Sequence, residues 1–348
     1  MSFSVDELAL PDDVETPEAD DFRALVDVRN AVEVGVLGSG ALAMSPAELL
    51  PIFRTTSHRT RRHFVARADG RIVGRGIIGW LKNPDAPAAS LNVDVLESHR
   101  GRGIGTALLK VLEDEAAALG RTVVQSQLIH STLEGGERVP SPTGFGDLPA
   151  ADPGVRFLRN NGYDLEMVVR VSCLDLGAAP TIPDSEYGLV TWAGDTPTEW
   201  LEDIASLKTT MAVEEPTAGM ESVEDSWDAE RVRQRDEIQS ASGRPLLTAA
   251  AQDKASGRLV AYTEASLGPD RAGAAVQEDT LVMPGHRGHG LGMLVKAANS
   301  HQISEVAPGA TDVLTFNAED NVPMLRVNEA LGFRAIGLEG AWQKRLRE

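Results

Sequence analysis

The sequence predicts an α/β protein made of two copies of one fold, each a mixed central sheet flanked by helices. Three observations support this prediction. At 348 residues the chain is long for one hydrophobic core and favours two domains. A glycine-rich segment, HRGRGIGTALLK at 99–110, returns as HRGHGLGMLVK at 286–296. In both places an apolar strand pattern precedes the segment and a helical pattern follows it, so the order of elements repeats as well.

The first copy has the following elements, taken from apolar residues at helical or alternating spacing. A helix over 21–37 is followed by strands over 63–70, 71–81 and 91–97, a helix over 104–120, a strand over 122–129, a helix over 153–163 and a strand over 165–174. Residues 131–153 are rich in glycine, proline and serine and are expected to form a loop.

The second copy repeats this order. A strand over 188–194 is followed by helices over 196–211 and 226–239, strands over 246–253, 258–267 and 278–283, a helix that ends near 306, a strand over 312–317, a helix over 322–333 and a strand over 341–346. Proline and glycine interrupt both periodicities at 177–186, so we predict a linker there between a domain at 1–176 and one at 187–348.

Two pairs of landmarks measure the repeat. Arg100 and Arg287 are 187 residues apart, whereas Gly162 and Gly332, near the end of the last helix of each copy, are 170 apart. The first copy is therefore longer between its turn and its last helix, and the loop at 131–153 is expected to hold the extra residues.

Charge and composition limit the partners. The formal net charge is −19, with 33 basic and 52 acidic residues, which argues against nucleic-acid binding and suits a cationic small substrate. A single cysteine suggests a reducing compartment. The first residues lack the basic and apolar regions of a signal peptide, and no apolar stretch is long enough to span a membrane, so we expect a cytoplasmic protein.

The repeated turn has glycine at alternate positions. Glycine allows the backbone to approach a ligand closely, and successive N–H groups can then point at one anion. The helix that follows adds its positive end, so each turn is suited to a pyrophosphate, although one such turn alone could be a tight connection that binds nothing. The glycines are Gly101, Gly103, Gly105, Gly288, Gly290 and Gly292.

Other nucleotide and metal motifs have less support. GSGALA at 38–43 fits a dinucleotide fingerprint, but Ser45-Pro46 is expected to interrupt the next helix and no acidic residue follows about twenty positions on. Neither turn is a triphosphatase P-loop. His286 and His289 flank the second turn without the rest of a ligand set, so we expect no metal.

Both turns resemble the acetyl-CoA motif of the GNAT superfamily of N-acetyltransferases, [RQ]-x-x-G-x-[GA]. The resemblance covers nearly the whole chain as a tandem pair of GNAT domains, in a layout similar to mycothiol synthase and related actinobacterial tandem acetyltransferases. The residues that it implies at the pyrophosphate are Arg100, Gly101, Arg102, Gly103, Ile104 and Gly105 in the first copy, and Arg287, Gly288, His289, Gly290, Leu291 and Gly292 in the second.

The resemblance also implies a place for the pantetheine chain. In GNAT domains the strand before the turn splays away from the strand after it, and the acyl-pantetheine chain lies in the gap. Main-chain groups of the first strand bind that chain, and one N–H can stabilise the oxyanion. The residues implied are Val93 and Val95 in the first copy, Thr280, Leu281 and Val282 in the second, with Asn317 and Asn321 also expected at the cofactor.

An amine acceptor must lose a proton before it attacks, because its pKa lies near 10.4. Glu278 stands four residues before Val282, where related acetyltransferases often place a base, whereas the first copy has Leu91. Glu264, on the neighbouring strand, is a second candidate carboxylate. Either carboxylate could instead be a solvent-facing residue of its strand.

The superfamily's last helix has the pattern N-x-x-A-x-x-L-Y-x-x-x-G-F, in which the tyrosine protonates the leaving thiolate. Asn321 matches its first position, but Asn328 replaces the tyrosine, and the first copy has Leu158. Tyr262 could act as the acid in its place or simply line the cleft.

We therefore expect an acetyl-CoA-dependent N-acetyltransferase that moves an acetyl group to a primary amine of a small molecule by direct attack in a ternary complex. The second copy is the expected catalyst and the first a structural or cofactor-holding copy, in a monomer or a homodimer. One alternative is a noncatalytic acetyl-CoA-binding sensor or scaffold. Another is mycothiol synthase.

Overall fold

The computed structural model describes residues 2–130, 135–214, 216–222 and 226–346. They form two compact units. Unit 1 comprises residues 1–169, 217–223 and 337–348, and unit 2 comprises residues 170–216 and 224–336. Residues 131–134, part of the expected loop at 131–153, lie outside the described residues. No helix in the described part of the chain is both long and apolar enough to cross a bilayer.

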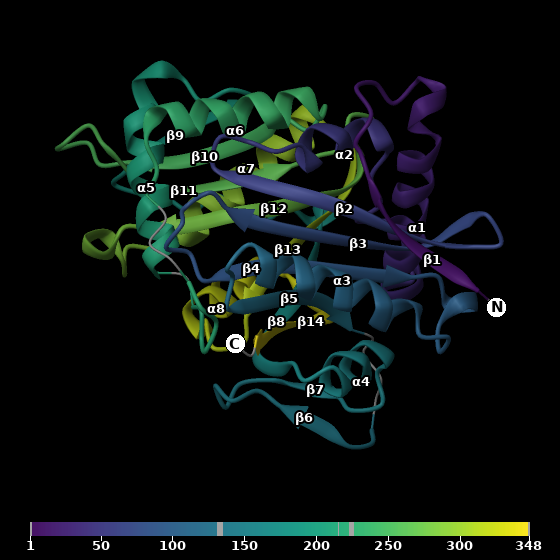
Figure 1. Cartoon of the computed structure of the whole chain (residues 1–348). Helices are drawn as coiled ribbons and strands as arrows, with labels where there is room; N and C mark the ends of the chain where they lie inside the picture. The colour runs from purple at the N-terminus through teal and green to yellow at the C-terminus, as the bar shows by residue number, and fades with distance from the viewer. Residues whose placement is uncertain (1, 131–134, 215, 223–225, 347–348) are drawn as a thin grey trace. The chain divides into compact units, whose positions relative to one another are not determined.

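Unit 1 has a sheet in the order β1-β2-β3-β4-β5-β14 (Figure 1). Its strands are β1 (Phe3–Leu8), β2 (Arg59–Ala68), β3 (Arg71–Leu81), β4 (Ala88–Val95), β5 (Val123–His130) and most of β14 (Arg334–Arg345), with a small hairpin of β6 (Arg138–Pro140) and β7 (Asp147–Pro149). Its helices are α1 (Asp20–Leu37), α2 (Pro46–Phe53), α3 (Ile104–Ala118) and α4 (Pro153–Asn160). β8 (Asp164–Asp175) runs from unit 1 into unit 2.

Helices cover both faces of this sheet because successive side chains of a strand point to opposite sides. On β2, Val65 packs with residues of α1 and α2, whereas Phe64 and Ala66 pack with residues of α3. Helix α3 lies along β3 and β4 (Figure 1).

Unit 2 has its strands in the order β13-β12-β11-β10-β9. They are β9 (Gly188–Ala193), β10 (Leu246–Gln252), β11 (Leu259–Ser266), β12 (Ala272–Val282) and β13 (Gly309–Ala318), and its helices are α5 (Leu201–Glu214), α6 (Ala229–Ala241), α7 (Leu291–Val306) and α8 (Val322–Leu331). Tyr262 of β11 packs toward α5 and α6, and its neighbour Ala261 packs toward α7. The predicted α/β fold is confirmed: in each unit helices flank strands that pair both antiparallel and parallel, although all of these strands belong to one 12-stranded sheet.

Two local expectations were wrong. Ser45-Pro46 does not interrupt a helix but begins α2: the Ser45 side chain accepts from the Glu48 N–H and Glu48 reciprocates, with proline in the first turn, where its missing N–H costs nothing. The stretch before it is the helix expected over 21–37: it forms α1, which ends where Gly38 adopts the left-handed conformation at φ 70°. The loop at 131–153 contains the β6–β7 hairpin.

The compact units differ from the predicted domains at the C-terminus. β14 follows α8 in sequence, yet its residues from 337 onward belong to unit 1 and pair antiparallel with β5, from Leu338 opposite His130 to Arg345 opposite Val123. Unit 1 therefore needs the last strand of the chain to cover the edge of β5. The boundaries 1–176 and 187–348 stay a prediction.

Candidate active site

The two glycine-rich turns have the same geometry. A short 3₁₀ turn, Glu97–His99 or Pro284–His286, links the strand to the glycines, and the turn arginine folds back onto the strand. Arg100 Nε donates to the carbonyl of Val95 at 3.0 Å, and Arg287 Nε donates to that of Val282 at 3.2 Å. The two turns therefore share not only their sequence pattern but also the hydrogen bond from the turn arginine to the preceding strand.

Each turn leaves room for an anion at the start of its helix. Gly101, Gly103, Gly288 and Gly290 have φ between 72° and 83°, and a Cβ atom added at any of them would meet nothing within 4 Å. Among the described residues no side chain caps α3 at Gly103 or α7 at Gly290, so the first N–H groups of both helices have no capping acceptor from the N-cap residue. Both turns fit a diphosphate held by backbone amides.

The strand before each turn loses its parallel neighbour as it approaches the glycines. β4 pairs with β5 only over Ala88–Ser90, opposite Val123–Gln125. β12 pairs with β13 only over Ala272–Val276. The remaining residues of β4 and β12, which include the expected pantetheine contacts, therefore border a gap in the sheet.

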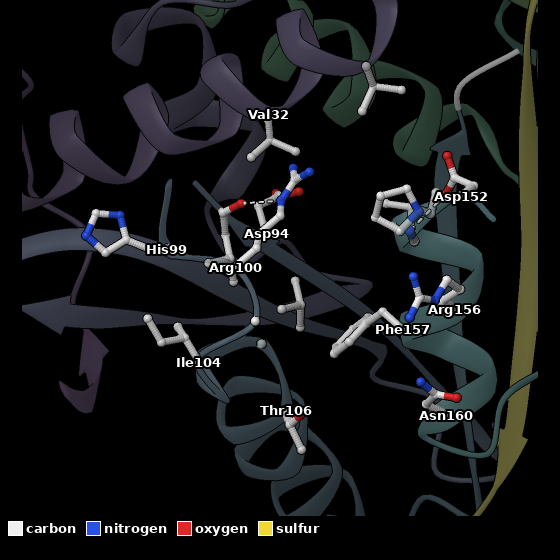
Figure 2. Close-up of a pocket in the computed structure, with 18 of the residues that line it drawn as sticks. Val32, Asp94, His99, Arg100, Ile104, Thr106, Asp152, Arg156, Phe157 and Asn160 are labelled. Atoms are coloured by element: carbon white, nitrogen blue, oxygen red, sulfur yellow. Dashed lines mark hydrogen bonds between the residues drawn. The ribbon is translucent and has the colours of Figure 1, made fainter. Parts of the chain in front are cut away.

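In unit 1 this gap is a cavity of about 430 Å³. Apolar side chains of β4, β5 and α4 line it, together with the backbone of the turn and the first residues of α3. Figure 2 shows Phe157 and Arg156 of α4 directed into the cavity from one side, with Asp94 and Arg100 on the other. The lining includes Val93, Val95, Arg100, Gly101, Gly103, Ile104 and Gly105 from the residues predicted for the cofactor.

The carboxylate on this wall is already paired. Asp94 Oδ2 accepts from Arg75 Nε at 2.6 Å, and both side chains are buried. Leu91, which takes the place of Glu278 in the first copy, is buried at 2% exposure. The first copy thus combines a cavity beside its glycine turn with an apolar residue at the position expected for the base.

The second copy differs by a β-bulge. Thr263 of β11 lies opposite Thr280 of β12, and Ala265 lies opposite Gln277, so Glu264 faces two residues, Glu278 and Asp279. The equivalent pairing of β3 with β4 has no such shift. Bulges redirect side chains and are frequent beside active sites, and this one lies where β12 has parted from β13.

Glu278 keeps access to solvent at the bulge. Its Oε1 accepts from the Ser266 hydroxyl at 2.7 Å. The pKa of Glu278 is raised above its ordinary value of 4.5, chiefly by loss of hydration among the groups packed around it; the Ser266 hydrogen bond opposes this rise, and the charges of Asp279 and Glu264 add to it. A carboxylate that solvent reaches and whose pKa is raised is suited to accept a proton.

Glu264 and Tyr262 are held by other groups. Glu264 is 1% exposed and accepts from Lys208 at 2.8 Å and from Arg235 at 2.7 Å. Lys208 also donates to Asp279 at 2.6 Å, and the Tyr262 hydroxyl donates to the same Asp279 oxygen at 3.1 Å. Burial raises the pKa of Tyr262, with the charge of Asp279 adding to the effect. Glu264 is thus not a solvent-facing residue of its strand.

The predicted asparagines lie at the far side of the second gap. Asn317 Oδ1 accepts from Asn328 Nδ2 at 2.6 Å, so the residue that replaces the family's tyrosine is buried and bound to a predicted cofactor residue. Asn321 caps α8, accepting from the Met324 N–H. The Thr280 hydroxyl hydrogen-bonds that of Thr263 at 2.7 Å.

Lys208, Arg235 and Ser266 were not predicted from the sequence. The first two lie on α5 and α6, and only the fold brings them to β11. In unit 1 the sequence also gave no sign of the contacts of Asp152, which caps α4 and accepts from His130 Nδ1 at 2.9 Å.

Comparison with known proteins agrees with this geometry. Residues 59–139 match the family model described as acetyltransferase (GNAT) domain. The chain resembles the solved structure of a tandem GNAT protein from the clavulanic acid biosynthesis pathway, without acetyl-CoA, at 25% identity and a TM-score of 0.76, over 99% of this chain and 98% of that one. The fold is that of a tandem GNAT protein.

Two further solved structures have a similar fold at lower identity. A GCN5-related N-acetyltransferase from Sphaerobacter thermophilus matches at 15% identity and a TM-score of 0.63, over 99% of this chain and 96% of that one. A putative acetyltransferase from Pyrococcus horikoshii matches at 12% and 0.56, over 99% and 90%. The search of curated proteins found no match.

Proposed function

We propose that the protein transfers an acetyl group from acetyl-CoA to a primary amine, and that unit 2 performs the chemistry. The observation that carries this proposal is the position of Glu278: in a bulge, beside the gap of the sheet, open to solvent, with a raised pKa. Acetyl-CoA would supply an activated thioester. The turn at 287–292 would hold its diphosphate, and residues 280–282 would hold its pantetheine chain.

Glu278 takes the proton of the acceptor's ammonium group, directly or through one water, and leaves a free amine. The amine nitrogen then forms a bond to the thioester carbon while the carbon–sulfur bond breaks. The thiolate leaves and takes up, through water, the second proton that the nitrogen loses as the amide forms; because the ordinary pKa of a thiol is near 8.5, this needs no dedicated acid. Tyr262 donates its proton to Asp279, so we assign it to positioning rather than to protonation of the thiolate.

The electrostatics of unit 2 favour a cationic acceptor. Glu264, Glu278 and Asp279 oppose the two cations Lys208 and Arg235, and Asp236 takes a further contact from Arg235. The excess of carboxylates attracts an ammonium group. The charges of Asp279 and Glu264 also add to the rise in the pKa of Glu278 that loss of hydration causes.

Unit 1 would bind acetyl-CoA without turning it over. Its cavity contains the turn and the gap, but Leu91 stands in place of the base and Asp94 is paired with Arg75. This contrast favours a role for the first copy in binding the cofactor without catalysis. Under the sensor or scaffold alternative, both copies would have this role.

Release of free thiol from acetyl-CoA, measured across a panel of primary amines, tests the proposal. We expect Glu278→Gln to lower kcat by about 100-fold or more while the KM for acetyl-CoA changes little. Glu305→Gln is the matched control, because Glu305 is an exposed glutamate on α7 of the same unit. Saturable cofactor binding without amine-dependent thiol release would instead indicate a sensor. The panel also includes the cysteinyl pseudo-disaccharide that mycothiol synthase acetylates. Thiol release with this acceptor would support the mycothiol synthase alternative.

A further inference from the structure

The helices α4 and α8 occupy equivalent places in the two copies. A shift of 170 residues, which superimposes Gly162 on Gly332, also places Arg156 on Arg326. Residues 153–160 and 323–330 then have the same succession of buried, intermediate and exposed positions, and both arginines are exposed. Both copies thus have an exposed arginine at the same position of this helix.

Both helices pack against the start of the helix that follows the turn. The ring of Phe157 lies so close to Gly105 that an added Cβ would come within 3.2 Å of it, and Val327 lies 3.8 Å from the equivalent point on Gly292. Arg156 directly precedes Phe157, and Arg326 directly precedes Val327. The two arginines therefore occupy equivalent positions relative to the glycine turns of their copies.

In unit 1 a chain of buried hydrogen bonds fixes the N-terminus of α4. Trp342 Nε1 donates to His130 Nε2 at 3.2 Å, and His130 Nδ1 donates to Asp152. Asp152 in turn accepts from the N–H groups of Gly154 and Val155. The helix that carries Arg156 is therefore held firmly at the cavity.

Arg156 lines the cavity of unit 1 and is directed into it, across from the glycine turn (Figure 2). Among the described residues, the side chains of Arg156 and Arg326 have neither a hydrogen bond nor an ion pair. In a chain with 52 acidic and 33 basic residues, an arginine that faces a cavity without a carboxylate partner is available to an anion. Its planar guanidinium matches a phosphate group.

We propose that Arg156 and Arg326 each bind a phosphate group of coenzyme A, across the gap from the glycine turn. This inference rests on the proposed function, since it requires coenzyme A in both copies. The backbone amides of the turn carry no net charge, and the turn arginines Arg100 and Arg287 fold back onto their strands, so Arg156 and Arg326 add a charged contact from the other side of the gap.

Isothermal titration of the full chain with coenzyme A, 3′-dephospho-coenzyme A and pantetheine tests this assignment. We expect Arg156→Gln and Arg326→Gln each to weaken coenzyme A binding at one site about tenfold and to leave pantetheine binding unchanged. Arg156→Lys should recover part of the loss. Arg159→Gln is the matched control, because Arg159 is exposed on the same helix but does not line the cavity.

The three ligands separate the outcomes. If an arginine variant loses affinity for both coenzyme A and its dephospho form, the arginine contacts the diphosphate. If it loses affinity for coenzyme A alone, the arginine contacts the 3′-phosphate. Binding by Arg156→Gln and Arg326→Gln as tight as that of Arg159→Gln would overturn the assignment while leaving the proposed function intact. If the wild-type chain bound no coenzyme A, both would fail.

Discussion

Replacement of Lys296 by methionine should stabilise unit 2, and by an amount that depends on pH. Lys296 lies on α7, the helix that begins at the second glycine turn, and is 2% exposed. Its Nζ has no hydrogen-bond partner among the described residues and lies 5.1 Å from the ring centroid of Phe333. With the 187-residue spacing of the two glycine turns, Lys296 aligns with Leu109, a buried leucine of the first copy. The lysine thus occupies a core position.

Burial lowers the pKa of Lys296 from its ordinary 10.5 to about 7. This difference corresponds to at most about 5 kcal/mol, because one pKa unit is about 1.4 kcal/mol. The unfolded chain binds the proton below pH 10.5 and the folded chain only below about pH 7, so the free energy of unfolding of the wild type rises with pH between these values. Methionine has no proton to lose and removes the penalty.

We expect Lys296→Met to raise the free energy of unfolding of unit 2 by about 2 to 4 kcal/mol at pH 6, with a gain that shrinks toward pH 10. Urea unfolding of both proteins at pH 6, 8 and 10, followed by hydrogen exchange on α7, measures this gain. Lys110→Met is the control: Lys110 is exposed on α3, and its loss should change stability by less than about 0.5 kcal/mol. Equal stability of wild type and Lys296→Met at pH 6, or a gain independent of pH, would refute the reasoning.

Two further predictions concern catalysis and the C-terminal strand. Ser266→Ala removes the hydrogen bond that stabilises ionised Glu278, so the pKa of Glu278 should rise and the acidic limb of the kcat/KM profile should move to higher pH; a profile unchanged from wild type would argue against Glu278 as the base. Removal of residues 337–348 exposes the edge of β5, so amide exchange should accelerate over 123–130 and stay unchanged over 246–252. Full protection of β5 in the truncated chain would contradict the pairing described for unit 1.

The repeated turns could be predicted from sequence because their signal is local. Glycines at alternate positions between a strand and a helix specify both the backbone conformation and the exposed amides. The start of α2 was also encoded locally, in Ser45, Pro46 and Glu48, but the proline was interpreted as a helix breaker when its place in the first turn makes it compatible with a helix start.

The contacts of the catalytic region could not be predicted in the same way. Glu264 was visible as a carboxylate on a strand, but its partners Lys208 and Arg235 are 56 and 29 residues away along the chain. The pairing of β14 with β5 joins residues about 200 positions apart, and an apolar strand pattern does not specify its neighbour. Long-range packing therefore decides which carboxylate stays open to solvent.

The central claim is that two sets of backbone amides, at the starts of α3 and α7, hold the diphosphate of coenzyme A. Calorimetric titration of coenzyme A into wild type, Gly103→Ala and Gly290→Ala tests it most directly, because alanine at these positive φ values is strained and its methyl group enters the open space of the turn. We predict two binding events in the wild type and the loss of one in each variant. Two undiminished events in both variants, or no heat with the wild type, would contradict the account.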